Sequence, residues 1–528
     1  MPVKQKPFNS DLFSFSDFFS NKTNKSNKTK INKSKTIKSK TIKSKTHSSL
    51  RKTYSYDENT ISNILNTIYS MNNPINNTLI KYNDNESKLL NKESFNNFKI
   101  SKPFASEILN SYYDKINDLY IYKKANRGNK DQKTPKIVTH ATEDFTRGLR
   151  TFLNTRYNDL PVPTISNAFV KLWEVLDTFD SITNTKNNKS FKVFHICEAP
   201  GQMILSCKYF VDKKCSNIDM KNYDWRANSL NPYNPVNKAK YGKYSDIFTD
   251  DYKLMKNNPK KWLWGADNTG DITKVKNIKW FRKYINDQWL GNENDKLDFI
   301  CGDGGLSTDN DAFLLQKLDL AQAITVVACS SKGGSCCIKH FTPFIRSKKD
   351  TYNASGFFLG FLYLYYTAFE QVSLFKPYSS NPDSGEFYVV GINFLGISET
   401  QIENLYKVLD DFKLNHAIIE REKIPETFII QINNFIKLMS QLNNNAIEKS
   451  NLLLTCYNNM PNIKAKGIYG KDGKAEKDRW QTPNNKKSES EKTDLYEMLK
   501  CNNFLDEKNI ETILVPRYNE WIKKYNFE

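Results

Sequence analysis

Between residues 160 and 396, short apolar runs alternate with longer stretches whose apolar residues recur at helical spacing. Such an alternation of strands and helices is typical of a parallel α/β sheet. Four of the apolar runs predict buried strands, at 191–197, 297–301, 335–339 and 387–394. A fifth run, at 371–376, alternates apolar and polar residues, which predicts a strand at or near the edge of the sheet.

Two stretches of this segment predict helices of different kinds. The stretch 166–179 is amphipathic, with Lys171 pointing away from an apolar face formed by Phe169, Leu172, Leu176 and Phe179. The uncharged, aromatic run between Asp350 and Glu370 contains several Tyr, Thr and Ser residues and falls short of the ~20 apolar residues that a membrane span needs. We therefore expect a buried helix there, and a soluble protein without a membrane partner.

The flanking segments have a different composition. The low-complexity stretch 21–52 repeats Ile-Lys-Ser-Lys-Thr at 37–41 and 42–46 and offers few apolar residues to bury, which predicts disorder. A polar, loop-like insertion is expected near 462–493, and a terminal helix at 518–525. The chain divides into a disordered basic arm (1–54), a helical N-terminal extension (55–159), an α/β domain (160–396) and a helical C-terminal region (397–528).

The formal net charge of +20 favours a polyanionic partner, usually nucleic acid. From Met1 to Lys52 there are fourteen Lys and Arg residues against two Asp, so the arm supplies about +12 of this charge. The arm is either an electrostatic tether to RNA, a localisation signal or a solvated tail. Asn, Lys, Ile and Tyr have AT-rich codons, so a biased genome is an alternative explanation of the lysine content.

The nine cysteines are scattered without a CxxC pair, and there are only five His residues. This pattern excludes a small disulfide scaffold and disfavours a structural zinc site. No secretory signal is visible at the start of the chain. We therefore expect reduced thiols and a cytoplasmic location.

The loop that follows the first predicted strand is the first candidate ligand site. It comprises Cys197-Glu-Ala-Pro-Gly-Gln202, at the strand end where α/β folds bind ligands. Gly201 allows close backbone approach, Pro200 stiffens the turn beside Ala199, and Glu198 offers a carboxylate to an amine. The loop lacks GxGxxG spacing, which disfavours a dinucleotide. An ordinary strand-to-helix turn is the alternative.

Two further Asp residues are candidate ligand contacts. Asp271, in Trp264-Gly-Ala-Asp-Asn-Thr-Gly-Asp-Ile-Thr273, could accept a hydrogen bond from an exocyclic adenine amine, although an Asx-turn explains it equally. Asp219 follows Asn217-Ile218 and could hold a ribose diol. Trp225, Tyr233 and Trp264 could stack on bases, but core packing is the stronger expectation for each.

Three charged residues stand at strand ends, where α/β folds hold catalytic groups. Asp303 lies in Cys301-Gly-Asp-Gly-Gly, Lys339 ends a strand entered through Gly333-Gly334, and Glu386 immediately precedes a strand. Each alone is best explained as a surface charge. Together with Lys171 they make two Lys and two acids around a ligand loop, which indicates a proton-transfer site.

These motifs resemble those of the FtsJ-like family of RNA ribose 2′-O-methyltransferases, over about residues 160–396. The family carries a Lys-Asp-Lys-Glu tetrad in fixed contexts. This chain matches them with Ser166-Asn-Ala-Phe-Val-Lys171-Leu, Asp303-Gly-Gly305, Lys339-His-Phe, and Ser384-Gly-Glu386-Phe-Tyr-Val-Val, the last with one residue inserted on each side. The ligand loop and the Gly-Asp-Ile-Thr segment also fit, but Gln202-Met203 stands where the family usually has an aromatic residue.

The resemblance implies a Rossmann-like methyltransferase fold with a mostly parallel seven-stranded sheet flanked by helices. It also implies S-adenosylmethionine as cofactor, bound by Glu198, Ala199, Pro200, Gly201, Asp219, Asp271 and Asp303. It is strongest to the branch that contains mRNA cap methyltransferases of eukaryotes and large viruses. Methylation of ribosomal or other structured RNA is one alternative, and a catalytically silent RNA-binding subunit of a virion is another.

The tetrad predicts a mechanism that needs no metal. A ribose hydroxyl is a weak nucleophile and needs a base or a cation that stabilises its developing alkoxide. We expect Lys339 to be the base, Lys171 to depress the pKa of Lys339 and stabilise the oxyanion, and Asp303 and Glu386 to orient the two ammonium groups.

Overall fold

The computed structural model describes residues 78–80, 94–104, 144–160, 162–184, 190–241, 249–291, 296–306, 312–342, 348–382, 384–459 and 507–527. The expected basic arm, most of the N-terminal extension and the insertion near 462–493 lie outside these residues. All described residues belong to one unit, Thr53–Glu528.

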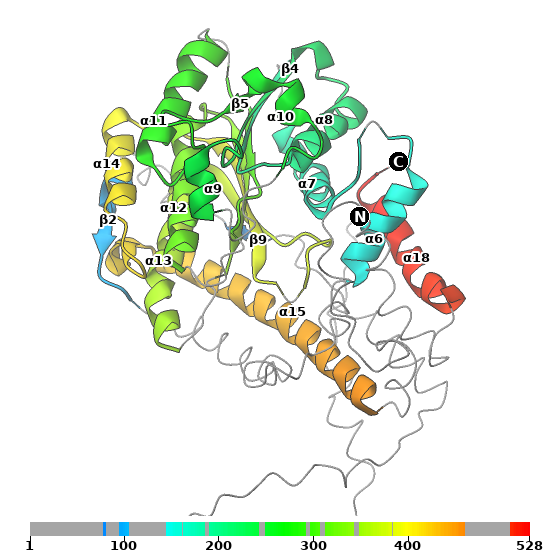
Figure 1. Ribbon diagram of the computed structural model, residues 1–528. Helices are drawn as coiled ribbons and strands as arrows, with labels where there is room; N and C mark the ends of the chain where they lie inside the picture. Colours follow the sequence, from blue (N-terminus) through cyan, green and yellow to red (C-terminus); the bar gives the residue numbers. More distant parts are fainter. Residues whose placement is uncertain are drawn as a thin grey trace, which may run out of the picture. The chain divides into compact units, whose positions relative to one another are not determined.

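An eight-stranded sheet forms the centre of the described part (Figure 1). In spatial order its strands are β1 (Thr78–Ile80), β8 (Phe369–Phe375), β9 (Glu386–Phe394), β7 (Ser335–Phe341), β6 (Phe299–Gly302), β3 (Phe191–Ile196), β4 (Tyr223–Asn228) and β5 (Trp262–Leu263). The five strands from β7 to β5 are parallel, and β9, β8 and β1 pair antiparallel. All five strands expected from the sequence are present, and β8 is a near-edge strand as predicted. The short β1 adds an eighth strand to the expected seven.

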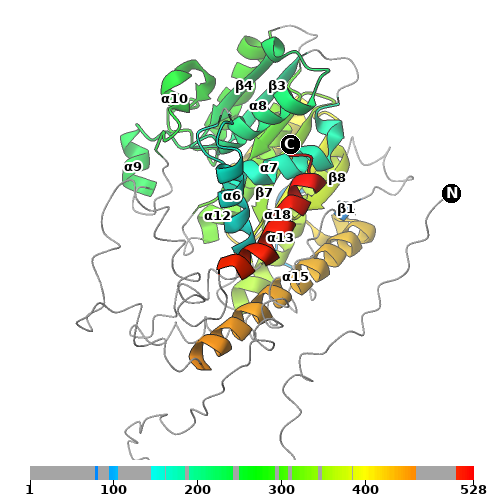
Figure 2. The same ribbon diagram turned by 90° about the vertical axis from the view of Figure 1, so that its right-hand side faces the viewer.

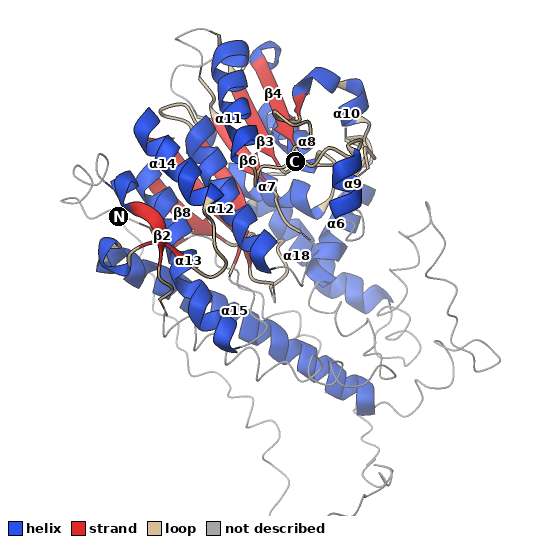
Figure 3. Ribbon diagram, turned by 60° about the vertical axis from the view of Figure 1, so that its left-hand side comes forward, coloured by secondary structure: helices blue, strands red, loops and turns tan. Residues whose placement is uncertain are grey.

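Helices cover both faces of the sheet (Figure 3) because the side chains of each strand alternate between two apolar layers. Phe194 and Ile196 of β3 enter the layer that contains α11 (Val275–Tyr284), α12 (Ala312–Cys329), α13 (Lys348–Ala368) and α14 (Glu399–Asp410). Phe191 and Val193 enter the layer that contains α7 (Asn167–Thr178), α8 (Gln202–Lys214) and α18 (Glu507–Lys524). This is the Rossmann-like arrangement expected from the alternating pattern.

The flanking segments add helices and a second, two-stranded sheet. α6 (Asp144–Arg156) lies beside α18, as Figures 1 and 2 show. β2 (Phe98–Ser101) pairs antiparallel with β10 (Ala417–Ile419), and the long α15 (Glu426–Asn459) follows. The shorter helices are η2 (Ser94–Asn97), η3 (Asp180–Ile182), η4 (Met220–Asn222), α9 (Pro235–Tyr241), α10 (Leu254–Asn257), η6 (Pro259–Lys261), η7 (Ile285–Leu290) and η8 (Arg421–Lys423).

The aromatic run around 350–370 forms α13, whose side chains from Phe357 onward are almost completely buried, as the sequence predicts. Within the described residues, only α12 is long and apolar enough to cross a membrane, and most of α12 is buried among the other elements. The seven cysteines whose side chains the structure describes are all free thiols.

Candidate active site

The loop between β3 and α8 places a buried carboxylate at the carboxyl end of the sheet. Glu198 is 3 % exposed, and its Oε1 accepts a hydrogen bond from the backbone N–H of Met203 in the first turn of α8 (2.6 Å). Its Oε2 has no partner in the described part of the chain. Burial and the nearby Asp303 raise the pKa of Glu198 well above its usual range. One oxygen is therefore anchored, while the other remains available to a ligand.

The loop conformation needs the glycine at position 201. Gly201 has φ +115°, a backbone conformation that disfavours other residues, and a Cβ there would lie 2.3 Å from Leu254 Cδ1. Gln202 then joins α8 to the segment before α7, because its Oε1 accepts from Ser166 N (3.0 Å) and its Nε2 donates to Thr164 O (3.2 Å). Gln202 thus holds two parts of the site together at the position where the family usually has an aromatic residue.

Asp271 forms an Asx-turn and also faces the same cavity. Its Oδ1 accepts from the backbone N–H of Thr273 (3.0 Å) and from the Thr273 hydroxyl (2.6 Å). Its Oδ2 accepts from the Tyr241 hydroxyl (3.1 Å). The Asx-turn is therefore confirmed, and it fixes a carboxylate that lines the cavity wall, while contact with an adenine amine stays a prediction.

Gly270, the residue before Asp271, is tightly enclosed, which leads to a stability prediction. It has φ +70°, and a Cβ there would lie 1.7 Å from the backbone oxygen of Ser229. We expect Gly270→Ala to lower the free energy of unfolding by about 2 kcal/mol, through overpacking and backbone strain. Gly291→Ala is the matched control, since Gly291 has φ +57° but nothing within 4 Å. It should cost about 1 kcal/mol. Equal urea-unfolding midpoints for the two variants would contradict the steric argument.

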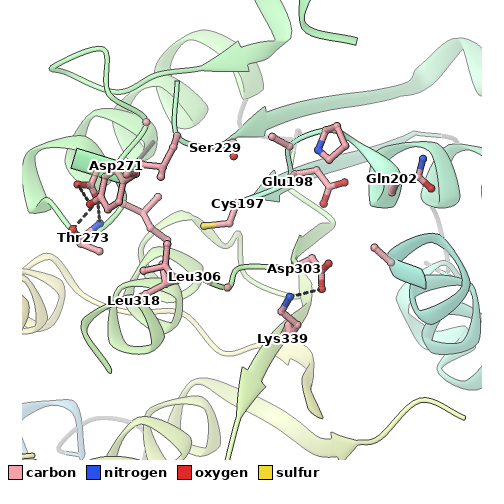
Figure 4. Close-up of a pocket in the computed structure, with 18 of the residues that line it drawn as sticks. Cys197, Glu198, Gln202, Ser229, Asp271, Thr273, Asp303, Leu306, Leu318 and Lys339 are labelled. Atoms are coloured by element: carbon pink, nitrogen blue, oxygen red, sulfur yellow. Dashed lines mark hydrogen bonds and ion pairs between the residues drawn. The ribbon is translucent and has the colours of Figure 1, made fainter. Parts of the chain in front are cut away.

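These loops enclose a cavity of about 450 Å³ over the carboxyl ends of the parallel strands (Figure 4). Figure 4 shows Asp271 on one side of the cavity and the Asp303–Lys339 pair on the other, with Cys197 between them. Apolar side chains complete the wall: Ile272, Leu306, Leu314 and Leu318. Ala199 and Pro200 also line it. A cavity of this volume and mixed lining is typical of a small-molecule site.

The sheet register brings Asp303 and Lys339 together. β6 and β7 are parallel with Gly302 opposite Ile338, so the residues that follow, Asp303 and Lys339, are also neighbours. Lys339 Nζ lies 3.1 Å from Asp303 Oδ1, and the Tyr388 hydroxyl donates to the same oxygen (2.9 Å). The pair forms part of the cavity wall.

Lys171 and Glu386 form the second half of the tetrad. Antiparallel pairing sets Tyr388 opposite Lys339, and Glu386, two residues earlier on β9, is on the same face. Lys171 Nζ from α7 donates to Glu386 Oε1 at 2.5 Å, and the Ser380 hydroxyl donates to that oxygen at 2.8 Å. Burial by itself raises the pKa of Glu386, but Lys171, Lys339 and Lys376 outweigh it and hold this pKa at about 2.

The pKa of Lys339 is raised, whereas Lys171 was expected from the sequence to lower it. Burial lowers the pKa of Lys339, but the negative charges of Asp303 and Glu386 outweigh burial and raise it above its ordinary value. Lys171 does not depress this pKa as expected, because its ammonium group is paired with Glu386. In the protein without ligand, Lys339 is therefore an ammonium group at neutral pH.

Asp219 does not reach the cavity, contrary to the sequence prediction. It is exposed, and its side chain caps η4 by accepting from Lys221 N (2.9 Å). It precedes β4 and therefore lies at the amino end of this strand, whereas the cavity lies at the carboxyl ends. The residues after β4 that line the cavity are Ser229 and Leu230.

The aromatic candidates divide as follows. Trp225 is buried in the core, and Trp264 packs against that core and stacks on Trp262 with ring centroids 5.9 Å apart. Core packing is therefore the role of these two residues, as expected. The expectation of core packing is wrong for Tyr233, which is 65 % exposed, and base stacking by Tyr233 stays a prediction.

Sequence reasoning missed three residues of the site: Tyr388, Ser380 and Lys376. Tyr388 could have been found, because it lies two residues after Glu386 on a strand and so shares its face. Lys376 is 1 % exposed and donates to the backbone oxygens of Asn381, Ser384 and Glu386. The sequence around Lys376 and Ser380 contains no motif that predicts their place in the site, because only the turn between β8 and β9 brings them to Glu386.

The open, mostly parallel sheet with a polar cavity at its carboxyl edge is a Rossmann-like arrangement. Residues 164–394 match the family model of FtsJ-like methyltransferases. Members of this family depend on S-adenosylmethionine.

Proteins of viruses and animals are similar to this chain. An uncharacterized protein of Acanthamoeba polyphaga mimivirus is 31 % identical over 308 residues, which are 57 % of this chain and 34 % of that protein. The cap-specific mRNA (nucleoside-2′-O-)-methyltransferase 2 of Danio rerio is 26 % identical over 329 residues, 60 % of this chain and 41 % of that protein. A protein of African swine fever virus named "Probable methyltransferase" is 26 % identical over 352 residues, 61 % of this chain and 74 % of that protein. The chain thus spans well under half the length of the first two.

Proposed function

We propose that this protein is an S-adenosylmethionine-dependent RNA ribose 2′-O-methyltransferase that acts on the 5′ cap region of mRNA. The observation that carries the proposal is that the ion pair Lys339–Asp303 lines a ligand-sized cavity while a second ion pair, Lys171–Glu386, lies close enough for Glu386 to raise the pKa of Lys339. The names of relatives that methylate mRNA caps support the choice of substrate.

The residues around the cavity fit the cofactor. The free Oε2 of Glu198 suits the amino group of a methionine moiety, and the carboxylate of Asp271 suits an exocyclic adenine amine. The apolar wall formed by Ile272, Leu306 and Leu318 suits the adenine ring. When bound, S-adenosylmethionine supplies an electrophilic methyl group on a sulfonium. Because Asp219 lies away from the cavity, it has no part in this site.

The tetrad would activate the ribose hydroxyl. Lys339 Nζ, held by Asp303, is placed to contact the hydroxyl and to stabilise the alkoxide as it develops. For Lys339 to accept the hydroxyl proton it must first lose its own, and any positive charge bound close to Nζ favours that loss. Lys171 and Glu386 hold the second ammonium group beside the first pair, where it stabilises the same oxyanion. Alignment of the reacting groups contributes about 7–11 kcal/mol in well-oriented reactions.

The choice between substrates can be tested directly. The protein is incubated with labelled cofactor and with matched capped and uncapped RNAs, and the methylated nucleosides are mapped by mass. We expect ribose methylation near the 5′ end of the capped RNA and at least tenfold less on the uncapped RNA. Equal labelling of both would instead favour a structured-RNA enzyme. Cofactor binding without transfer to any RNA would favour the silent subunit. We propose the cytoplasm as the site of action.

A further inference from the structure

Glu174 is a buried carboxylate that the proposed mechanism does not use. It lies on α7, three residues after Lys171, and is completely buried. Its carboxylate accepts hydrogen bonds from the backbone N–H groups of Tyr378 (2.6 Å) and Ser379 (2.9 Å) and from Trp521 Nε1 (2.8 Å). All three donors are neutral, and burial raises the pKa of Glu174 in spite of them. Burying a carboxylate against neutral donors is costly, so a purely apolar contact would serve packing better.

The backbone that Glu174 holds leads directly to the tetrad. Tyr378 and Ser379 belong to the turn between β8 and β9, and the next residue, Ser380, donates to the same Glu386 oxygen that binds Lys171. Lys376 binds carbonyl oxygens further along this turn. The turn is thus fixed through its N–H groups by Glu174 and through its carbonyl groups by Lys376.

The third donor to Glu174 comes from the C-terminal helix. Trp521 lies on α18, which is outside the family match at 164–394. α18 is also tied to α7 next to Glu174, because Trp173 Nε1 donates to Tyr525 O (2.8 Å) and the rings of Trp173 and Phe527 lie 4.7 Å apart. Figure 2 shows α18 running beside α6, on the side of the sheet that carries α7. The carboxylate of Glu174 therefore joins the C-terminal helix to the turn that contains Ser380, whose hydroxyl donates to Glu386.

We propose that Glu174 is a positioning residue that couples the C-terminal helix α18 to the Lys171–Glu386 pair through the turn Tyr378–Ser380. Its side chain holds the Ser380 hydroxyl and the Glu386 carboxylate where Lys171 needs them. The expected effect of Glu174 on catalysis rests on the proposed function. The inference that Glu174 holds the turn Tyr378–Ser380 does not depend on that function.

The test uses Glu174→Gln in the full-length protein, since Gln keeps the volume but turns one acceptor oxygen into a donor that opposes the N–H groups. We expect kcat for methyl transfer to fall about tenfold to a hundredfold, with the KM for cofactor within about twofold of wild type. Hydrogen exchange of backbone amides in 377–386 should become at least tenfold faster. Trp521→Phe, which removes one donor and keeps a ring, should change both quantities in the same direction but less.

Asp177→Asn is the matched control. Asp177 lies on the same helix and accepts from Asn526 in the same C-terminal segment (3.3 Å), but it does not hold the turn. Its kcat and exchange should equal those of wild type. A wild-type kcat for Glu174→Gln overturns the proposed coupling, and so does faster exchange spread over the whole sheet rather than confined to 377–386. If wild type transfers no methyl group, the proposed function fails, while local exchange still decides whether Glu174 holds the turn.

Discussion

Lys339→Ala is expected to reduce kcat for methyl transfer to RNA by about a thousandfold, with little change in cofactor affinity. Lys339 Nζ is the group on the cavity wall that can both contact a ribose hydroxyl and take its proton, and general-base catalysis contributes about 10²–10⁴ in rate. The measurement is single-turnover transfer of a labelled methyl group to capped RNA. Lys332→Ala is the control, because Lys332 is exposed in the turn before β7.

Lys339→Arg separates the two roles of this ammonium group. Arg keeps the positive charge but cannot lose its proton in the neutral range. If Lys339 is the base, the Arg variant should be as inactive as the Ala variant. In addition, kcat/KM of wild type should rise about tenfold per pH unit through the neutral range, since the raised pKa of Lys339 in the ligand-free protein leaves only a small neutral fraction. Near-normal turnover by either variant would refute the assignment of Lys339 as base.

The sequence pattern was sufficient for the strands that are apolar throughout but not for β4. Within β4, Asp224 and Arg226 alternate with core residues, and their charges are satisfied by a 2.7 Å ion pair and by Trp289 Nε1, which donates to Asp224 at 2.7 Å. In the sequence, such a strand resembles a surface loop, because the residues that pair with its charged side chains lie far away along the chain. Because β4 was not predicted, the position of Asp219 at the amino end of this strand was not recognised, which explains why the predicted cofactor contact of Asp219 is not supported.

The candidate site was predictable in its members but not in its electrostatics. Each tetrad residue lies in a local sequence context that resembles the family's, so the resemblance was sufficient to predict that the four side chains lie near one another. Lys171 was expected to act on Lys339, but its ammonium group binds Glu386. This contact depends on the β7–β9 register and on the position of α7. The negative charges of Asp303 and Glu386 outweigh burial and reverse the expected pKa shift of Lys339. Shifts of this kind are sums of opposing charge and burial effects over a few ångströms, and a linear sequence does not contain those distances.

Glu386→Gln is expected to lower the free energy of unfolding by about 3 kcal/mol at pH 7. The pKa of Glu386 is held at about 2 against an ordinary value of 4.5, and each pKa unit corresponds to about 1.4 kcal/mol. The substitution also leaves Lys171 buried without the carboxylate that pairs with it, and breaking a buried pair typically costs about 3–5 kcal/mol. The measurement is urea unfolding, with Glu370→Gln as the control because Glu370 is exposed on β8.

The pH dependence of this difference identifies its electrostatic origin. Because the pKa of Glu386 is lower in the folded protein than in the unfolded chain, its ionised form stabilises the fold above pH 4.5, and this contribution is lost as the pH falls towards about 2. The stability difference between wild type and Glu386→Gln should therefore be constant from pH 7 to about pH 5 and shrink below that. If the difference instead stays the same at pH 3.5 as at pH 7, the substitution acts through packing and the ion pair contributes little to the fold.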